Sequence, residues 1–229
     1  MTPLLLIPGY MLDETLWDDV LPLLGVDRPI IHGSLREGGA VEEMARRILA
    51  ASPPRLVLAG FSMGGYIARE IARLAPERVQ SLILVATSSR PDSQATREQR
   101  AKAARNTPQG PFRGLSKGAI VTSLHPDQAG NAALVERVRA MGARLGRDVF
   151  LRQSLLERGD MERLGAIACP TLVIAAAQDQ LRSLAEAEEL RDGIPAARLQ
   201  VVERSGHLIP LEQPAALAQL MLDWLQSSQ

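Results

Sequence analysis

Gly60-Phe61-Ser62-Met63-Gly64-Gly65 follows a short apolar run at residues 55–59 and precedes a helical pattern at residues 66–75. A strand, a Gly-x-Ser-x-Gly turn and a helix, in this order, hold a serine on a sharp, strained turn with its hydroxyl clear of the backbone. Gly60 and Gly64 lack the Cβ atoms that would collide where the chain reverses. The helix that follows points the positive end of its dipole at Ser62. The stretch therefore predicts an α/β fold in which Ser62 is a nucleophile.

Short apolar runs alternate with amphipathic helical patterns on both sides of this turn. Because such strands have no polar face, they indicate a parallel sheet that is covered by helices on both sides. We expect six strands, at residues 4–7, 29–31, 55–59, 79–86, 171–176 and 199–202. We expect the surrounding helices at residues 13–24, 41–51, 66–75, 185–190 and 211–225.

The pattern changes between the fourth and fifth predicted strands. Apolar residues recur there at helical spacing, and no strand pattern occurs. We expect four helices in this part, at residues 93–106, 115–124, 129–145 and 148–157. The predicted organisation is a three-layer α/β core of about six mainly parallel strands, residues 1–90 and 165–229, with an all-helical cap inserted at residues 91–164.

Composition limits the class of protein. The chain has 229 residues, of which 46% are hydrophobic but only 3% aromatic, so aliphatic side chains must fill the core. Lys and Arg number 26, as do Asp and Glu, so no excess of basic charge points to nucleic acid or anionic membranes. The single cysteine favours a reducing, cytoplasmic location. Neither a membrane span of roughly 20 apolar residues nor a signal peptide is expected.

A nucleophilic serine needs a base within hydrogen-bond reach. In an open parallel sheet, groups that do chemistry lie on loops at the carboxyl ends of the strands. His207 follows the last strand and is therefore the predicted base. His32 follows an early strand, where a structural or pocket-rim role is favoured, and His125 is expected to cap or pack the inserted helices. Both are also candidate substrate-binding residues, together with Phe112.

The base in turn needs an acid that orients it. Asp179, on the loop after the fifth strand, is the preferred acid. Its rival is Asp92, which lies six residues beyond the apolar run of the fourth strand. Glu203 and Glu212 are interpreted as surface or capping carboxylates. The predicted catalytic triad, in chain order, is Ser62, Asp179 and His207.

Acyl transfer through a tetrahedral intermediate also needs two donors for the oxyanion. The Met63 N–H, at the start of the nucleophile helix, is the first. Gly9 permits a turn after the first strand that directs the Tyr10 N–H inward as the second. The alternative is an ordinary turn in which Tyr10 packs as a side chain. Cys169 begins a strand at the opposite edge of the sheet and is expected to be packed and inert.

Taken together, these segments resemble the α/β-hydrolase fold family. The resemblance spans nearly the whole chain outside the insertion, and it rests on Leu6-Ile7-Pro8-Gly9, the Ser62 stretch, residues 170–174 with Asp179, and residues 206–214. It implies a serine, acid and histidine triad in that chain order, and a cap where the insertion lies. Many members have His-Gly where this chain has Pro8-Gly9, but only a side chain changes there, so backbone donation is expected to survive. Many also begin with two more strands, so a shorter sheet is expected.

The resemblance implies a serine esterase that cleaves small or medium acyl substrates through an acyl-enzyme. Thioester hydrolysis, lactone opening, carbon–carbon bond hydrolysis and acyl transfer use the same residues and stay open. A non-catalytic ligand receptor is the alternative of a different class. No metal-ligand spacing or phosphate-binding loop occurs, so no metal or cofactor is expected. The expected partner is a small-molecule ester, and the expected state is a monomer or homodimer.

The predicted cap differs from the core in charge. Residues 91–164 contain 13 basic and 8 acidic residues, a net of +5, which leaves −5 for the rest of the chain. The favoured interpretation is solvated helix faces with some ion pairs between cap and core. The alternative is a basic lid that attracts anionic acyl substrates.

Overall fold

The computed structural model of the protein describes residues 1–25, 27–107, 109–158 and 163–227. Its six strands form one sheet in the order β2-β1-β3-β4-β5-β6, and all five pairings are parallel. The strands are β1 (Leu4–Ile7), β2 (Ile30–His32), β3 (Leu56–Phe61), β4 (Val79–Val85), β5 (Thr171–Ala176) and β6 (Arg198–Val202). The predicted six-stranded α/β sheet is confirmed.

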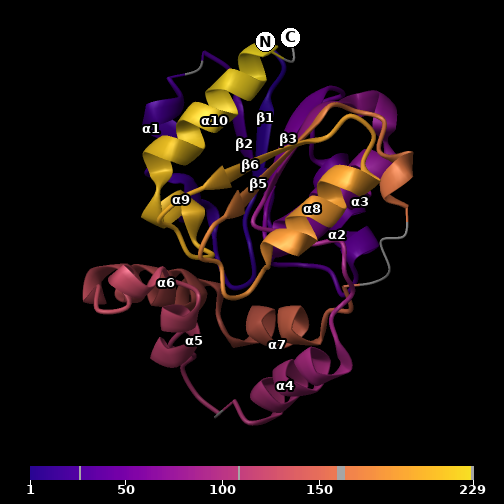
Figure 1. Ribbon diagram of the computed structural model, residues 1–229. Coiled ribbons are helices and arrows are strands. Elements are labelled where there is room, and N and C mark those ends of the chain that lie inside the picture. Colours follow the sequence, from indigo (N-terminus) through magenta and orange to yellow (C-terminus); the bar gives the residue numbers. More distant parts are fainter. Residues whose placement is uncertain (26, 108, 159–162, 228–229) are drawn as a thin grey trace.

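Helices cover both faces of this sheet and make three layers (Figure 1). One face carries α2 (Val41–Ala50), α3 (Met63–Leu74) and α8 (Leu184–Gly193). The other carries η1 (Glu14–Trp17), α1 (Leu21–Leu24), α9 (Ile209–Glu212) and α10 (Pro214–Ser227). Two short 3-10 turns, η2 (Pro76–Arg78) and η4 (Leu164–Ala166), precede β4 and β5. Because both faces are covered, every residue of β1, β3 and β5 is buried.

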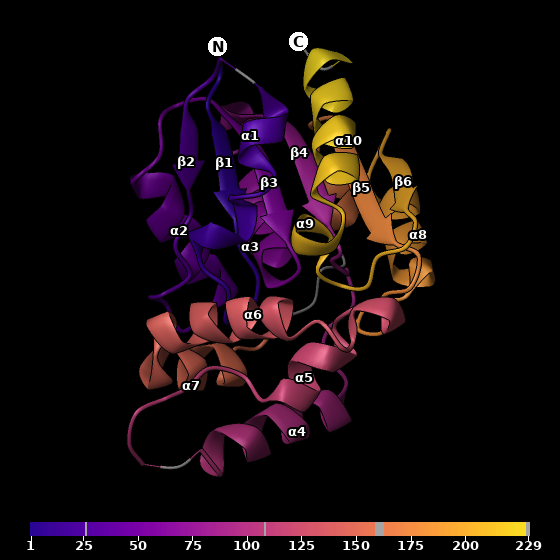
Figure 2. The same cartoon turned by 90° about the vertical axis from the view of Figure 1, so that its left-hand side faces the viewer.

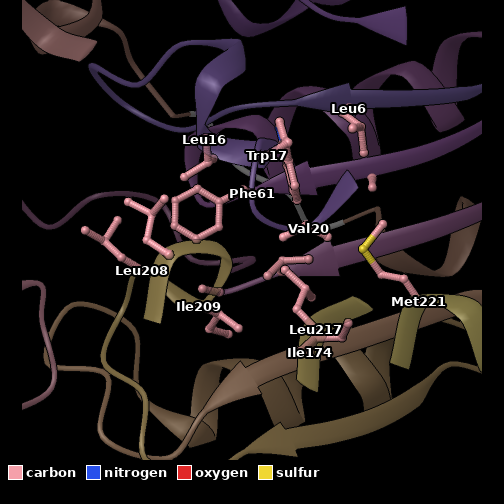
Figure 3. Close-up of a cluster of buried hydrophobic side chains, with 14 of the residues drawn as sticks. Leu6, Leu16, Trp17, Val20, Phe61, Ile174, Leu208, Ile209, Leu217 and Met221 are labelled. Atoms are coloured by element: carbon pink, nitrogen blue, oxygen red, sulfur yellow. The ribbon is translucent and has the colours of Figure 1, made fainter. Parts of the chain in front are cut away.

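The core on the α1 and α10 face reaches the loops at the carboxyl ends of the strands (Figure 3). Trp17 and Val20 pack there near Leu217 and Met221, and all four side chains are fully buried. The same cluster continues to Phe61, at the end of β3, and to Leu208. Apolar packing therefore fixes the residues next to Ser62 and His207.

The insertion between β4 and β5 is helical in its described residues. It contains α4 (Gln94–Arg105), α5 (Lys117–Thr122), η3 (Pro126–Gln128), α6 (Ala132–Leu145) and α7 (Arg147–Leu155). These helices lie across the edge of the sheet where the strand arrowheads end (Figure 2). We call residues 91–164 the helical insertion; its status as a separate cap domain stays a prediction.

Two of the predicted helices are each divided into two shorter elements in the structure, so their predicted continuity is wrong. Residues 13–24 form η1 and α1 with a turn between them, and residues 211–225 are divided between α9 and α10. A proline stands at the start of α1 and of α10, where its missing N–H costs nothing but the preceding helix cannot run through it. α3 begins at Met63 rather than at the predicted Tyr66, because Gly64 and Gly65 are already helical.

Candidate active site

Ser62 stands between the end of β3 and the start of α3 in a strained conformation. Its φ is +50° and its ψ is −113°, a region that side chains other than glycine rarely adopt. The Ser62 N–H donates to the Val85 carbonyl oxygen at 2.8 Å, and the Thr87 hydroxyl donates to the Ser62 carbonyl oxygen at 2.7 Å. These two bonds from the end of β4 hold the turn.

The turn also requires glycine on either side of the serine. A Cβ on Gly60 would lie 2.5 Å from the Gly64 carbonyl oxygen, and one on Gly64 would lie 2.4 Å from the Pro8 carbonyl oxygen. Both obstacles are backbone atoms, which cannot turn aside as a flexible side chain would. The close approach of α3 to the loop after β1 therefore depends on these two residues.

The side chains of the predicted triad lie in a hydrogen-bonded row. His207 Nε2 is 2.8 Å from Ser62 Oγ, and His207 Nδ1 is 2.7 Å from Asp179 Oδ2. They come from the loops after β3, β5 and β6, which meet at one edge of the sheet. Ser62 is only 7% exposed and His207 only 6%, so little water competes for these bonds. Chemically, the row can move a proton from the hydroxyl to the imidazole; its catalytic role remains a prediction.

Asp179 is held in place by the backbone that follows it. Its Oδ1 accepts hydrogen bonds from the N–H groups of Leu181, at 2.7 Å, and Arg182, at 3.0 Å. Its side chain is 1% exposed. Oδ1 is thus committed to the loop, and Oδ2 is left for His207.

The rival carboxylates have other partners or lie at the surface. Asp92 is buried and forms ion pairs with Arg100 and Arg158. Glu203 is exposed, as predicted. Glu212 is not at the surface: it is half-buried at the end of α9, and burial raises the pKa of its carboxyl group.

Glu212 instead joins the helical insertion to the histidine loop, a contact that sequence reasoning missed. Its Oε1 accepts the His125 N–H at 2.6 Å, while the His207 N–H donates to the Ser123 carbonyl oxygen at 2.7 Å. The approach is so close that a Cβ on Gly206 would lie 2.4 Å from the His125 nitrogen. The insertion thus fixes the backbone that carries His207.

The predicted oxyanion loop after β1 is tied to the insertion as well. The Met11 N–H donates to Gln153 Oε1 at 2.8 Å, and the Tyr10 hydroxyl is 2.7 Å from Ser154 Oγ. Gln153, which is 1% exposed, was also missed, because nothing marks it out within an amphipathic helix. The Met63 N–H is the first of α3 and has no acceptor within the helix, so it is free to serve as a donor.

The three candidate substrate-binding residues lie in different places. Phe112 packs on Phe150, with ring centres 4.9 Å apart, in the small apolar cluster that also contacts Tyr10. His32 is exposed on β2, the edge strand, and is not brought to the triad. His125 caps η3, where its Nδ1 accepts the Asp127 N–H at 3.1 Å. Their contact with substrate stays a prediction.

The remaining predictions from the sequence concern Cys169, metal sites and membrane-spanning helices. Cys169 is 8% exposed, and burial raises the pKa of its thiol, as suits a packed side chain. Within the described ranges, no group of three or more His, Cys, Asp or Glu side chains is arranged to hold a metal ion. No helix of the described residues has the length and apolar character needed to cross a membrane.

Among the residues that the structure describes, two ion pairs join the insertion to the core, as the favoured interpretation of its charge expects. Arg137 pairs with Asp19, and Arg144 binds both carboxylate oxygens of Asp13, at 2.8 and 3.1 Å. Burial raises the pKa of Asp13, but the hydrogen bonds from Arg144 and Thr15 outweigh this effect, so that its pKa lies below the ordinary value. The folded protein therefore stabilises the charged form of Asp13.

Replacing Asp13 by asparagine should lower the free energy of unfolding by about 1–3 kcal/mol at pH 7. Because the folded-state pKa is depressed, the contribution is present above the unfolded-state pKa of about 3.9 and is lost as the pH falls through the folded-state value. Urea unfolding at pH 7 and pH 3 should thus show a difference that shrinks in acid. Asp19→Asn, in the more exposed pair, should cost less than about 1 kcal/mol. An Asp13 effect of equal size at both pH values would contradict this assignment.

Comparison with known proteins agrees with the fold. Residues 34–214 match the profile of the family described as alpha/beta hydrolase fold. This chain belongs to that family. The resemblance drawn from its motifs is confirmed, and membership of this family supports an enzyme of the hydrolase class.

The names of relatives of this α/β hydrolase describe hydrolysis of a methyl ester or a carbamate. A pimeloyl-[acyl-carrier protein] methyl ester esterase of Klebsiella pneumoniae (strain 342) is 40% identical over 96 residues, 37% of this chain and 36% of that protein. The match thus spans about a third of that relative's length. RutD of Variovorax paradoxus (strain S110), provisionally named a carbamate hydrolase, is 31% identical over 202 residues, 84% of this chain and 75% of RutD.

Solved structures share the architecture along the whole chain. A thermophilic esterase from Thermogutta terrifontis, described as malate bound, superposes with a TM-score of 0.83 at 28% identity. The superposition covers 100% of this hydrolase and 90% of that protein.

Proposed function

We propose that this hydrolase cleaves carboxylic esters of small to medium acyl substrates through an acyl-enzyme on Ser62. The observation that carries the proposal is the hydrogen-bonded row from Ser62 Oγ through His207 to Asp179, at 2.8 and 2.7 Å. A strained serine at the amino end of a helix, with a base in contact, is an activated nucleophile. The names of the esterase relatives support an ester as the substrate class.

In the first half-reaction, His207 Nε2 takes the proton of Ser62 as Oγ attacks the ester carbonyl carbon. The N–H groups of Tyr10 and Met63 donate hydrogen bonds to the carbonyl oxygen as negative charge develops on it. Each such donor lowers the free energy of the transition state by on the order of 3 kcal/mol. His207 then protonates the leaving alcohol, and the acyl group remains on Ser62. Asp179 fixes the imidazole tautomer and stabilises the imidazolium.

In the second half-reaction, the same imidazole deprotonates water, which attacks the acyl-enzyme and releases the acid. General base catalysis of this kind contributes about 10²–10⁴-fold. Hydrolysis of thioesters, lactones or carbon–carbon bonds and acyl transfer to another acceptor would use the same groups and remain alternatives, and the name of RutD adds carbamates to them. The cytoplasmic location and the monomeric or dimeric state remain predictions.

The purified protein should hydrolyse p-nitrophenyl acetate and butyrate. As the acyl-enzyme accumulates, an initial burst should release one molecule of p-nitrophenol for each molecule of enzyme. A fluorophosphonate should stop turnover and add its mass to the peptide that contains Ser62. Labelling of another residue, or none, would remove Ser62 from the mechanism. If no acyl substrate were turned over while a small ligand bound tightly, the ligand receptor would replace the enzyme.

A further inference from the structure

Four arginines from the core and the insertion gather beside the predicted active site. Three of them surround the ring of the fully buried Tyr66, one helical turn after Ser62. Their guanidinium carbons lie 4.9 Å (Arg69), 6.0 Å (Arg158) and 5.8 Å (Arg182) from the ring centre. Arg100 on α4 joins them through the carboxylate that it shares with Arg158. We call Arg69, Arg100, Arg158 and Arg182 the arginine cluster.

Within the part of the chain that the structure describes, the arginine cluster has more positive than negative charge. Asp92 is the counter-ion of both Arg100 and Arg158, and it lies 3.8 Å from Arg158 Nε, beyond hydrogen-bond distance. Glu186 pairs with Arg182 at 3.2 Å. Arg69 binds only a backbone carbonyl oxygen, that of Ser88. Four guanidinium groups thus share two carboxylates among the residues that the structure describes, and an unbalanced charge is costly when it is buried.

The cluster also leaves buried hydrogen-bond donors without acceptors. Within the described part of the chain, Nε and Nη1 of Arg69, Nε and Nη1 of Arg100, and Nε of Arg158 have no partner. Burial lowers the pKa values of Arg69 and Arg158 to about 10, so both stay protonated at neutral pH. Guanidinium N–H groups in this arrangement suit the paired oxygens of a carboxylate.

The position of the cluster connects it to the reacting atoms. The Arg158 guanidinium carbon lies 6.0 Å from the ring centres of both Tyr10 and Tyr66. Tyr10 carries one predicted oxyanion donor, and Tyr66 lies on the first turn of the helix that begins with the other. The backbone N–H of Arg182 donates a hydrogen bond to Asp179 Oδ1. The cluster is therefore in contact with residues that flank both predicted oxyanion donors and with the predicted acid.

Two pairs of arginines in the helical insertion differ in their surroundings. Arg137 and Arg144 are partly exposed, and each pairs with a core carboxylate. Arg100 and Arg158 have side chains that are only 15% and 7% exposed, and among the described residues they share one carboxylate, that of Asp92. A purely structural role would not require the unbalanced charge.

We propose that the arginine cluster binds a free carboxylate at the far end of the acyl chain, so that the substrate is a half-ester of a dicarboxylic acid. This inference rests on the proposed ester hydrolysis and adds the substrate class. The cluster binds and orients the acyl chain, while the ester bond at its other end is cleaved on Ser62. Inorganic phosphate offers similar oxygen atoms, so the test must separate a substrate site from a site for free anions.

The kinetic test compares monomethyl esters of succinate, glutarate, adipate and pimelate with the methyl esters of the corresponding monoamides, which are neutral and of equal size. For the best chain length, kcat/KM should be about tenfold or more higher for the charged ester. Arg158→Gln should remove most of this preference, and Arg158→Lys, which keeps the charge but not the planar fork, should retain part of it. Arg105→Gln, an exposed arginine on the same helix as Arg100, should keep both the rates and their ratio.

The binding test uses Ser62→Ala protein, in which the esters are not consumed. Calorimetry at constant ionic strength should detect the half-ester at least about tenfold more tightly than the amide ester, and Arg158→Gln should abolish the difference. Thermal unfolding of each variant shows whether it is folded. Binding of phosphate without preference for the half-ester would make this a free-anion site and overturn the substrate assignment.

The two proposals fail in different ways. Equal rates on charged and neutral esters, with fluorophosphonate labelling of Ser62 intact, would overturn the carboxylate site and leave ester hydrolysis standing. Selective binding of the half-ester without any turnover would overturn ester hydrolysis, and the arginine cluster would remain as a carboxylate-binding site.

Discussion

Replacing Ser62 by alanine should lower kcat for p-nitrophenyl butyrate by about 10⁴–10⁶-fold and abolish the burst of p-nitrophenol. The variant keeps the predicted oxyanion donors but has no hydroxyl for His207 Nε2 to deprotonate. Alanine would face the same backbone strain at φ +50°, and the bonds that hold the turn, to Val85 and from Thr87, use only backbone atoms of residue 62. The fold should therefore survive, with a melting temperature within a few degrees of the parent protein.

The matched control is Ser81→Ala. Ser81 lies on β4 and is 1% exposed, and its hydroxyl has no hydrogen-bond partner among the described residues. Its removal should change neither kcat nor the burst. Equal turnover by Ser62→Ala and the parent protein would show that a different group attacks the ester.

The sequence sufficed for the strands and for the turn at Ser62, because both follow from local chemistry. Apolar runs of four to six residues next to turn residues indicate strands that are buried on both faces of a sheet, as β1 and β5 are, and Gly60 and Gly64 are needed where backbones approach within contact distance. The order of the residues along the chain, and their positions on loops at the carboxyl ends of strands, then predicted His207 as the base and Asp179 as the acid. The structure brings these two side chains within hydrogen-bond distance of each other.

The sequence could not give the contacts between the insertion and the core. Gln153 reaches Met11 across 142 positions, and Glu212 reaches the His125 N–H across 87. No periodicity links such partners, and each residue type is ordinary for the surface of a helix. Arg100 and Arg158 likewise read as solvated charges, and their burial follows only from the way the helices pack. The breaks before α1 and α10 were missed because apolar spacing continued through both prolines.

Replacing Asp179 by asparagine should lower kcat by about 10⁴-fold with little change in stability. The reason lies in the hydrogen bonds of the carboxylate. Oδ1 accepts from the N–H groups of Leu181 and Arg182, so the carbonyl oxygen of the asparagine would take that place and its NH₂ group would face His207 Nδ1. Since a donor there requires Nδ1 to be an acceptor, the imidazole proton would move to Nε2, which could then no longer accept the proton of Ser62.

Two further variants make this test specific to the acid. Glu203→Gln changes an exposed carboxylate near the end of β6 and should leave kcat within about twofold. Asp92→Asn alters the counter-ion of Arg100 and Arg158 but not the tautomer of His207, so its effect on p-nitrophenyl butyrate should be far smaller than that of Asp179→Asn. If Asp92→Asn gave the larger loss of kcat, Asp92 would be the acid that acts through His207, and the 2.7 Å contact with Asp179 would have only a structural role.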